Sequence, residues 1–165
     1  MSSVQPERAY VGLGANLGHP EQTIMQAVQA LRANPRLTVV ACSGLWSSAP
    51  QDAPGPDFFN AVIAVQTDLS ARQLLDQLQD LERQFGRERP FPNAPRSLDL
   101  DLLMFGNQVL NEPDLTLPHP RMHMRAFVLE PLAEINPRLH IPLRGPIAQW
   151  RQQARGQVLH RLKSL

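Results

Sequence analysis

The chain has few of the sequence features that often indicate a protein's chemistry, namely cysteine, lysine and long apolar segments. It has a single cysteine, Cys42, so a disulfide within the chain is impossible and a cysteine-rich metal site is excluded. Its single lysine, Lys163, lies near the C-terminus, which excludes a P-loop lysine. It also lacks an apolar segment of about 18 residues and an apolar N-terminal leader, so we expect a cytoplasmic protein that makes no membrane contact.

Composition bounds the remaining possibilities. With 165 residues, 42% of them hydrophobic, the chain predicts one globular domain spanning residues 1–165. A net charge of +1 disfavours a polybasic nucleic-acid binder, so no nucleic-acid partner is expected. Apart from Lys163, every basic residue other than histidine is arginine, which favours planar, bidentate recognition of phosphate.

The most informative stretch is a predicted strand that begins after Arg96 and ends before Gly106. Its leucines alternate with Asp99 and Asp101, which is the period-two pattern of a strand with one buried face. Both carboxylates therefore leave the same face, with Cα atoms about 7 Å apart. They would repel each other unless a divalent cation lay between them. An ordinary strand with an acidic outer face is the alternative interpretation, and periodicity alone favours it.

Basic residues lie on both sides of this acidic strand. Arg87, Arg89 and Arg96 occupy the proline-rich loop before it, and His119 and Arg125 follow it. Carboxylates that hold a metal, with guanidinium groups beside them, suit a polyphosphate that carries a bound cation. Each arginine taken singly is more often just an exposed surface charge.

Three further patterns remain ambiguous at this level. Phe58 next to Asn60 can offer an aromatic face and an amide, or simply a core phenylalanine and a turn asparagine. The glycines from Gly12 to Gly18 have the wrong spacing for a dinucleotide fingerprint and predict a turn between strand and helix. Leu75, Gln79 and Glu82 share one helix face, which suits either the wall of a site or a solvated flank.

The order of predicted elements indicates the fold. Strands and helices follow the order β-α-β-β-α-β, typical of an α+β ferredoxin-like sandwich with an antiparallel sheet, helices on one face, and here a C-terminal extension without a recognisable motif. We also expect a hairpin at the turn of Gly106 and a short helix from Pro131. The expected elements are a strand over 9–13, a helix from 20 to about 34, strands over 37–46 and 58–67, a helix between 70 and 86, and a strand over 98–105.

Several blocks of sequence together resemble one enzyme family. The chain resembles the 6-hydroxymethyl-7,8-dihydropterin pyrophosphokinase family (2-amino-4-hydroxy-6-hydroxymethyldihydropteridine diphosphokinase) over nearly its whole length. The matching blocks are 10–18, 57–61, 95–106, 117–120 and 125–127, of which the segment Pro95-Arg-Ser-Leu-Asp-Leu-Asp101 is highly specific. One departure lies at 90–95, where the usual tryptophan is missing.

The resemblance implies a reaction and its ligands. It implies Mg²⁺-dependent transfer of pyrophosphate from ATP to the hydroxymethyl group of the pterin, with release of AMP, in folate biosynthesis. Two Mg²⁺ ions would be held by Asp99 and Asp101, ATP is the co-substrate, and a monomer with no obligate protein partner is expected. Implied catalytic residues are Arg87, Arg89, Asp99 and Asp101; implied ATP-binding residues are Leu75, Gln79, Arg87, Arg89, Arg96, Leu102, Thr116, His119 and Arg125; implied pterin-binding residues are Ser48, Ala49, Phe58, Asn60, Glu82 and Phe127.

Two other classes of protein share this topology. A catalytically silent ferredoxin-like module could keep the fold and a nucleotide, although the intact acidic pair and the basic residues favour an enzyme. An RNA-recognition module would need exposed sheet aromatics and a basic balance, and the sequence has neither.

Overall fold

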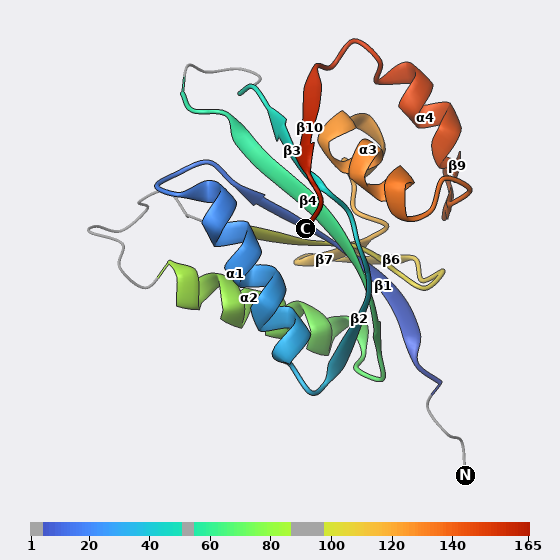
Figure 1. Cartoon of the computed structure of the whole chain (residues 1–165). Helices are drawn as coiled ribbons and strands as arrows, with labels where there is room; N and C mark the ends of the chain where they lie inside the picture. The colour runs from blue at the N-terminus through green and yellow to red at the C-terminus, as the bar shows by residue number, and fades with distance from the viewer. Residues whose placement is uncertain (1–4, 51–54, 87–97) are drawn as a thin grey trace.

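The computed structural model describes residues 5–50, 55–86 and 98–165. No helix in those ranges is both long and apolar enough to cross a membrane. The elements, in the order shown in Figure 1, are β1 (Glu7–Ala15), α1 (Pro20–Ala33), β2 (Leu37–Cys42), β3 (Leu45–Ser48), β4 (Phe58–Thr67), α2 (Ala71–Phe85), β5 (Asp99–Phe105), β6 (Leu110–Glu112), β7 (Leu115–Leu117), the 3₁₀ helix η1 (Met122–Met124), α3 (Ala126–Ile135), β8 (His140–Ile141), β9 (Gly145–Pro146), α4 (Ile147–Gln153) and β10 (Leu159–Lys163).

The central sheet confirms the predicted α+β ferredoxin-like fold. Its strands lie in the order β10-β3-β4-β1-β5, with β2 also paired to β4, and every pairing is antiparallel. This is the β-α-β-β-α-β order expected from the sequence, extended by β10 at the β3 edge. At the other edge lies β5, the acidic strand.

Helices α1 and α2 cover one face of this sheet, as expected (Figure 1). The start of α1 has Pro20 in its first turn. Ser70 caps α2 by a reciprocal capping box with Gln73, and Gly86 follows its last residue. Their apolar stripes bury Ile24 and Leu78 completely against the sheet.

The opposite face is partly covered by the C-terminal extension, whose position on the sheet the sequence did not predict. Helix α3 packs across β4, where Leu129 and Leu132 join Tyr10, Val62 and Ala64 in a second apolar core. Figure 1 shows α3 and α4 on the side of the sheet away from α1 and α2. The sheet thus lies between two layers of helix, and the second layer leaves room for a site beside α3.

The strand predicted over 37–46 is interrupted at Ser43. The Ser43 hydroxyl is buried, accepts a hydrogen bond from the Val62 N–H at 2.9 Å and donates one to the Gly44 carbonyl at 2.8 Å. The Ser43 hydroxyl therefore takes the place of a backbone acceptor in the hydrogen bonding with β4. This divides the predicted strand into β2 and β3. Local periodicity could not show this, because the partner is on another strand.

Replacing Ser43 by alanine is expected to lower the free energy of unfolding by about 1–3 kcal/mol, because the buried Val62 N–H loses its acceptor. Urea unfolding followed by circular dichroism measures the change. Ser164→Ala is the control: its hydroxyl meets Arg161 in an exposed hydrogen bond, so a change within about 0.5 kcal/mol is expected. Equal effects of the two substitutions would contradict the role given to Ser43.

Two local expectations need correction. The turn at Gly106 is present, but the strand after it, β6, pairs with β7 and not with β5. Helix α3 begins at Ala126, well before Pro131, which lies inside the helix. Both predictions were wrong because local turn and helix signals are weak, and tertiary contacts override them.

Candidate active site

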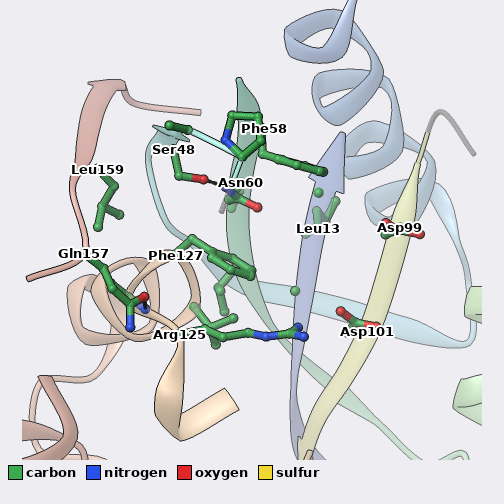
Figure 2. Close-up of a pocket in the computed structure, with 18 of the residues that line it drawn as sticks. Leu13, Ser48, Phe58, Asn60, Asp99, Asp101, Arg125, Phe127, Gln157 and Leu159 are labelled. Carbon is green, nitrogen blue, oxygen red and sulfur yellow. Dashed lines mark hydrogen bonds between the residues drawn. The ribbon is translucent and has the colours of Figure 1, made fainter. Parts of the chain in front are cut away.

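A cavity of about 550 Å³ opens on the sheet face that α3 leaves uncovered. Figure 2 shows its two parts: an aromatic part around Phe58 and Phe127, and a charged part around Asp99, Asp101 and Arg125. Residues from β1, β3, β4, β5, α3 and the segment before β10 line it. The site therefore brings together parts of the chain that are far apart in sequence.

The acidic pair lies opposite two glycines. In the β1–β5 register, Gly14 pairs with Asp99 and Gly12 with Asp101. Directly opposed residues in an antiparallel pair share a face, so the neighbours of both carboxylates on β1 carry no side chain. Across β1, Asn60 on β4 pairs with Gly14, which makes a row of Asn60, Gly14 and Asp99. The glycines form an open floor between the amide and the carboxylates.

The two carboxylates differ in environment. Asp99 is exposed and Asp101 is half-buried. Burial raises the pKa of the Asp101 carboxyl above its usual value, and the nearby positive charge of Arg125 offsets this only in part. An ionised Asp101 is therefore short of compensating positive charge, as expected of a carboxylate placed for a cation.

The donor set fits magnesium better than zinc. Within the described ranges no group of three or more His, Cys, Asp or Glu residues gathers that could hold a metal by itself. Mg²⁺ is commonly bound by one or two carboxylates, with phosphates and water completing its octahedral shell. Asp99 and Asp101 on an open floor match that requirement.

The aromatic part of the cavity combines two rings and an amide. Figure 2 shows Asn60 between Phe58 and Phe127. Asn60 is buried, and its Nδ2 donates to the Ser48 hydroxyl at 3.1 Å, which orients the amide. A flat heteroaromatic ligand could contact the rings while its edge meets the amide.

Arg125 lies between the two parts. It immediately precedes α3, and its guanidinium carbon lies 5.4 Å from the centroid of the Phe127 ring. In Figure 2 the side chain extends from α3 toward Asp101. Among the described residues, no carboxylate lies within ion-pair distance of Arg125, Arg121 or Arg144. This arginine cluster, which consists of Arg121, Arg125 and Arg144, therefore has positive charge available to bind an anion.

His119 lies beside this cluster but does not line the cavity. Its Nδ1 accepts a hydrogen bond from the Arg121 N–H at 3.1 Å, and its carbonyl accepts one from the Arg144 guanidinium at 2.7 Å. Burial, followed by the charges of Arg125, Arg144 and Arg121, lowers the pKa of His119 to about 4. The imidazole is therefore neutral at pH 7, with its proton on Nε2, where it can donate to an anion.

We expect NMR titration of the five histidines to give one ring, His119, with a midpoint near 4. Because this pKa is lower in the folded chain than the ordinary 6.5, unfolding takes up a proton between those pH values. The stability contributed by neutral His119 is thus complete above about pH 6.5 and is lost as the pH falls toward 4. His119→Gln should flatten that part of the stability profile. A His119 midpoint near 6.5 would contradict the assignment.

Some residues predicted for the site lie outside the described residues, and others do not line the cavity. Arg87, Arg89 and Arg96 are outside the described residues. Leu102 is buried in the core between the sheet and α1 and α2, on the other face from the cavity. Glu82 lies on α2, where its Oε2 accepts a hydrogen bond from the Leu100 N–H of the edge strand β5 at 2.9 Å. Glu82 therefore supports the acidic strand from the side and does not line the cavity.

The remaining predicted nucleotide contacts lie near the β5 edge. Leu75 and Gln79 are on α2, and Thr116 is on β7. Arg72 of α2 donates to Asp114, next to β7, at 2.7 Å, so the two elements are held together. None of the three residues lines the cavity, and their role in nucleotide binding stays a prediction.

Other lining residues escaped sequence reasoning. Gly12 and Gly14 were interpreted only as part of a turn, and the C-terminal segment was given no role. The structure places Gln157, Val158 and Leu159 of that segment in the cavity wall. Gly12 and Gly14 could have been found from their alternation along β1, whereas the C-terminal residues carry no local signal.

Together, the fold and cavity define a ferredoxin-like α+β protein with joined aromatic and charged binding surfaces. A Plasmodium falciparum HPPK-DHPS structure has the same fold, with a TM-score of 0.73 at 13% identity over 92% of this chain and 46% of that one. The chain thus spans less than half the length of that structure.

Sequence comparison narrows the class further. The 7,8-dihydro-6-hydroxymethylpterin-pyrophosphokinase (HPPK) family profile matches residues 10–137. The 2-amino-4-hydroxy-6-hydroxymethyldihydropteridine pyrophosphokinase of Pseudomonas aeruginosa is 45% identical over 137 residues, which are 82% of this chain and 85% of the relative. The Bacillus subtilis protein of that name is 38% identical over 77% of each chain. The chain belongs to the HPPK family of enzymes, as its sequence motifs predicted.

Proposed function

We propose that the chain transfers the pyrophosphoryl group of ATP to the hydroxymethyl oxygen of 6-hydroxymethyl-7,8-dihydropterin in folate biosynthesis. A bond forms between that oxygen and the β-phosphorus. The bond between the β-phosphorus and the oxygen bridging to the α-phosphorus breaks, AMP leaves with that oxygen, and the hydroxyl proton is released. We further propose that the catalytic unit is a monomer, which light scattering can test.

The observation that carries the proposal is that one cavity joins an aromatic surface to a charged surface. Between them lies the backbone of Gly12 and Gly14, which carries no side chain. A flat pterin between Phe58 and Phe127, read by Asn60, would direct its substituent along Gly14 toward Asp99 and Asp101. Holding both reactants in line in this way supplies much of the rate enhancement in phosphoryl transfer.

Two Mg²⁺ ions are proposed at Asp99 and Asp101. Bound there, they would neutralise the charge of the triphosphate around the β-phosphoryl group. The chain's own contribution is to hold the two carboxylates on one face, with Gly12 and Gly14 opposite them and no side chain in the way.

The basic residues would hold the phosphate oxygens. Arg125 reaches toward Asp101 from the pterin side, and neutral His119 can donate from Nε2. Arg87, Arg89 and Arg96 are proposed to complete this clamp, with Arg87 and Arg89 acting in catalysis. Glu82, which accepts the Leu100 N–H of β5, is proposed to orient the pterin.

The deciding experiment incubates the chain with ATP, Mg²⁺ and the hydroxymethyl dihydropterin and separates the nucleotides. We expect AMP in stoichiometric amount with the pyrophosphorylated pterin, and none when either the pterin or Mg²⁺ is left out. ADP as the product would overturn the proposed attack at the β-phosphorus. ATP binding without turnover would instead identify a silent binding module.

A further inference from the structure

The side-chain amide of Gln157 forms hydrogen bonds with the backbone on both sides of Arg125, the residue that lies between the two parts of the cavity. Its Oε1 accepts a hydrogen bond from the Ala126 N–H at 2.9 Å, and its Nε2 donates to the Met124 carbonyl at 2.8 Å. These are the peptide groups on either side of Arg125. One side chain therefore holds the backbone before and after the arginine, as a neighbouring strand would.

This contact replaces a missing local cap. Arg125 occupies the N-cap position of α3, and its own side chain makes no capping hydrogen bond. The first N–H groups of a helix have no partner within the helix, so they need one from elsewhere. Gln157 supplies it for Ala126 from a segment 31 residues further along the chain.

Gln157 is itself held at both ends of its segment. Its N–H donates to the Ala154 carbonyl at 3.0 Å in the turn that follows α4. Two residues later, Leu159 begins β10 and pairs with Ser48 of β3. The segment thus spans from the Arg125 wall of the cavity to the Ser48 wall, and Gln157 lines the space between them.

The direction of the Arg125 side chain depends on this backbone. The residue has φ −117° and ψ 111°, between the 3₁₀ turn of η1 and the first turn of α3. A change in these angles would swing the guanidinium away from the Phe127 ring and from Asp101. Because Arg125 is a long side chain pivoting on one residue, a small backbone shift becomes a large displacement at its tip.

We propose that Gln157 is a positioning residue that holds Arg125 in the orientation needed to contact the phosphates. This rests on the proposed function, in which Arg125 binds the triphosphate. It extends the working site beyond residues 10–137, which the family profile matches, into the C-terminal segment.

The test is a double-mutant cycle of Gln157→Leu and Arg125→Ala, with Gln153→Leu as the matched control. Gln153 is exposed on α4 and does not line the cavity. Gln157→Leu is expected to lower kcat/KM by about tenfold to a hundredfold in the native background, because a small misplacement of a catalytic group has effects of that size. The loss should lie mainly in kcat and in KM for ATP, with KM for the pterin nearly unchanged.

In the Arg125→Ala background the same substitution should have no further effect, because Gln157 acts through the arginine. Losses that simply add would show a structural role only and would overturn the proposal, as would native kinetics for Gln157→Leu. Thermal unfolding checks that each variant is folded. If Gln157→Leu does not fold, Gln157→Glu keeps the acceptor for the Ala126 N–H and loses the donor to Met124, and it enters the same cycle.

A second readout separates this inference from the proposed reaction. The affinity for Mg²⁺ with α,β-methylene-ATP, measured by calorimetry, goes through the same cycle without turnover. If the native chain releases no AMP, the proposed function fails, and the affinity cycle still decides whether Gln157 positions Arg125. If the native chain releases AMP and neither cycle shows coupling, only the role of Gln157 fails.

Discussion

Asp101→Asn is expected to lower kcat for AMP release by about two orders of magnitude or more while leaving the chain folded. The substitution removes a charged oxygen ligand from a site proposed for Mg²⁺, and a neutral amide is a poor substitute. Because burial already raises the pKa of Asp101, replacing the carboxylate with a neutral group should leave the melting temperature unchanged or slightly higher. Steady-state kinetics over a range of Mg²⁺ concentrations, with thermal unfolding alongside, measures both effects.

The matched control is Asp80→Asn, which changes an exposed aspartate on α2 that pairs with Arg83. Kinetics like those of the native chain are expected, with a stability change within about 0.5 kcal/mol. A nearly normal kcat for Asp101→Asn at saturating Mg²⁺ would remove Asp101 from the metal site. A large fall in melting temperature would show that the carboxylate is structural.

Gly14→Val is expected to reduce kcat/KM by at least about a hundredfold through steric exclusion at the floor of the cavity. A Cβ at Gly14 would lie 3.4 Å from the Asn60 Oδ1, and further methyl groups would stand in the row between Asn60 and Asp99. Valine favours strands, and the backbone here is not in the left-handed region, so the fold should not suffer. Calorimetric titration with the pterin, together with kinetics, measures the loss.

Gly14→Ala provides the graded control, since a single methyl group at that distance requires a shift of only a few tenths of an ångström. We expect it to keep most of the activity and to be at least as stable as the native chain. Unchanged pterin affinity in a folded Gly14→Val variant would show that the substrate does not cross this floor.

Local sequence signals predicted the elements that depend on near neighbours. The bounds of β4 and α2 match their expected ranges because each has a clear periodic stripe, and α2 also has strong capping residues at Ser70 and Gly86. The common face of Asp99 and Asp101 likewise follows from strand alternation alone. By contrast, β2 and β3 are separated by a side-chain contact between Ser43 and Val62, which no local pattern records.

The site shows the same division. Phe58, Asn60, Asp99, Asp101, Arg125 and Phe127 were predicted, and the structure gathers them around one cavity, although their roles stay predictions. Glu82 was predicted as a ligand contact; it does not line the cavity and accepts a hydrogen bond from the Leu100 N–H of the acidic strand, so its contact with a ligand stays a prediction. The packing of α2 against β5 decides which part of the strand a residue of α2 contacts. A sequence motif does not record that packing.

By itself the sequence determined the fold class, the family and the pairing of two carboxylates on one strand face, because these depend on periodicity and on specific motifs. Only the tertiary structure decided what lies opposite and around them. The register between β1 and β5 places Gly12 and Gly14 opposite the aspartates. The path of the chain after α4 brings Gln157 back to the backbone on either side of Arg125. Both relations join residues far apart in sequence, where hydrogen-bond geometry and packing, not local propensity, select the partner.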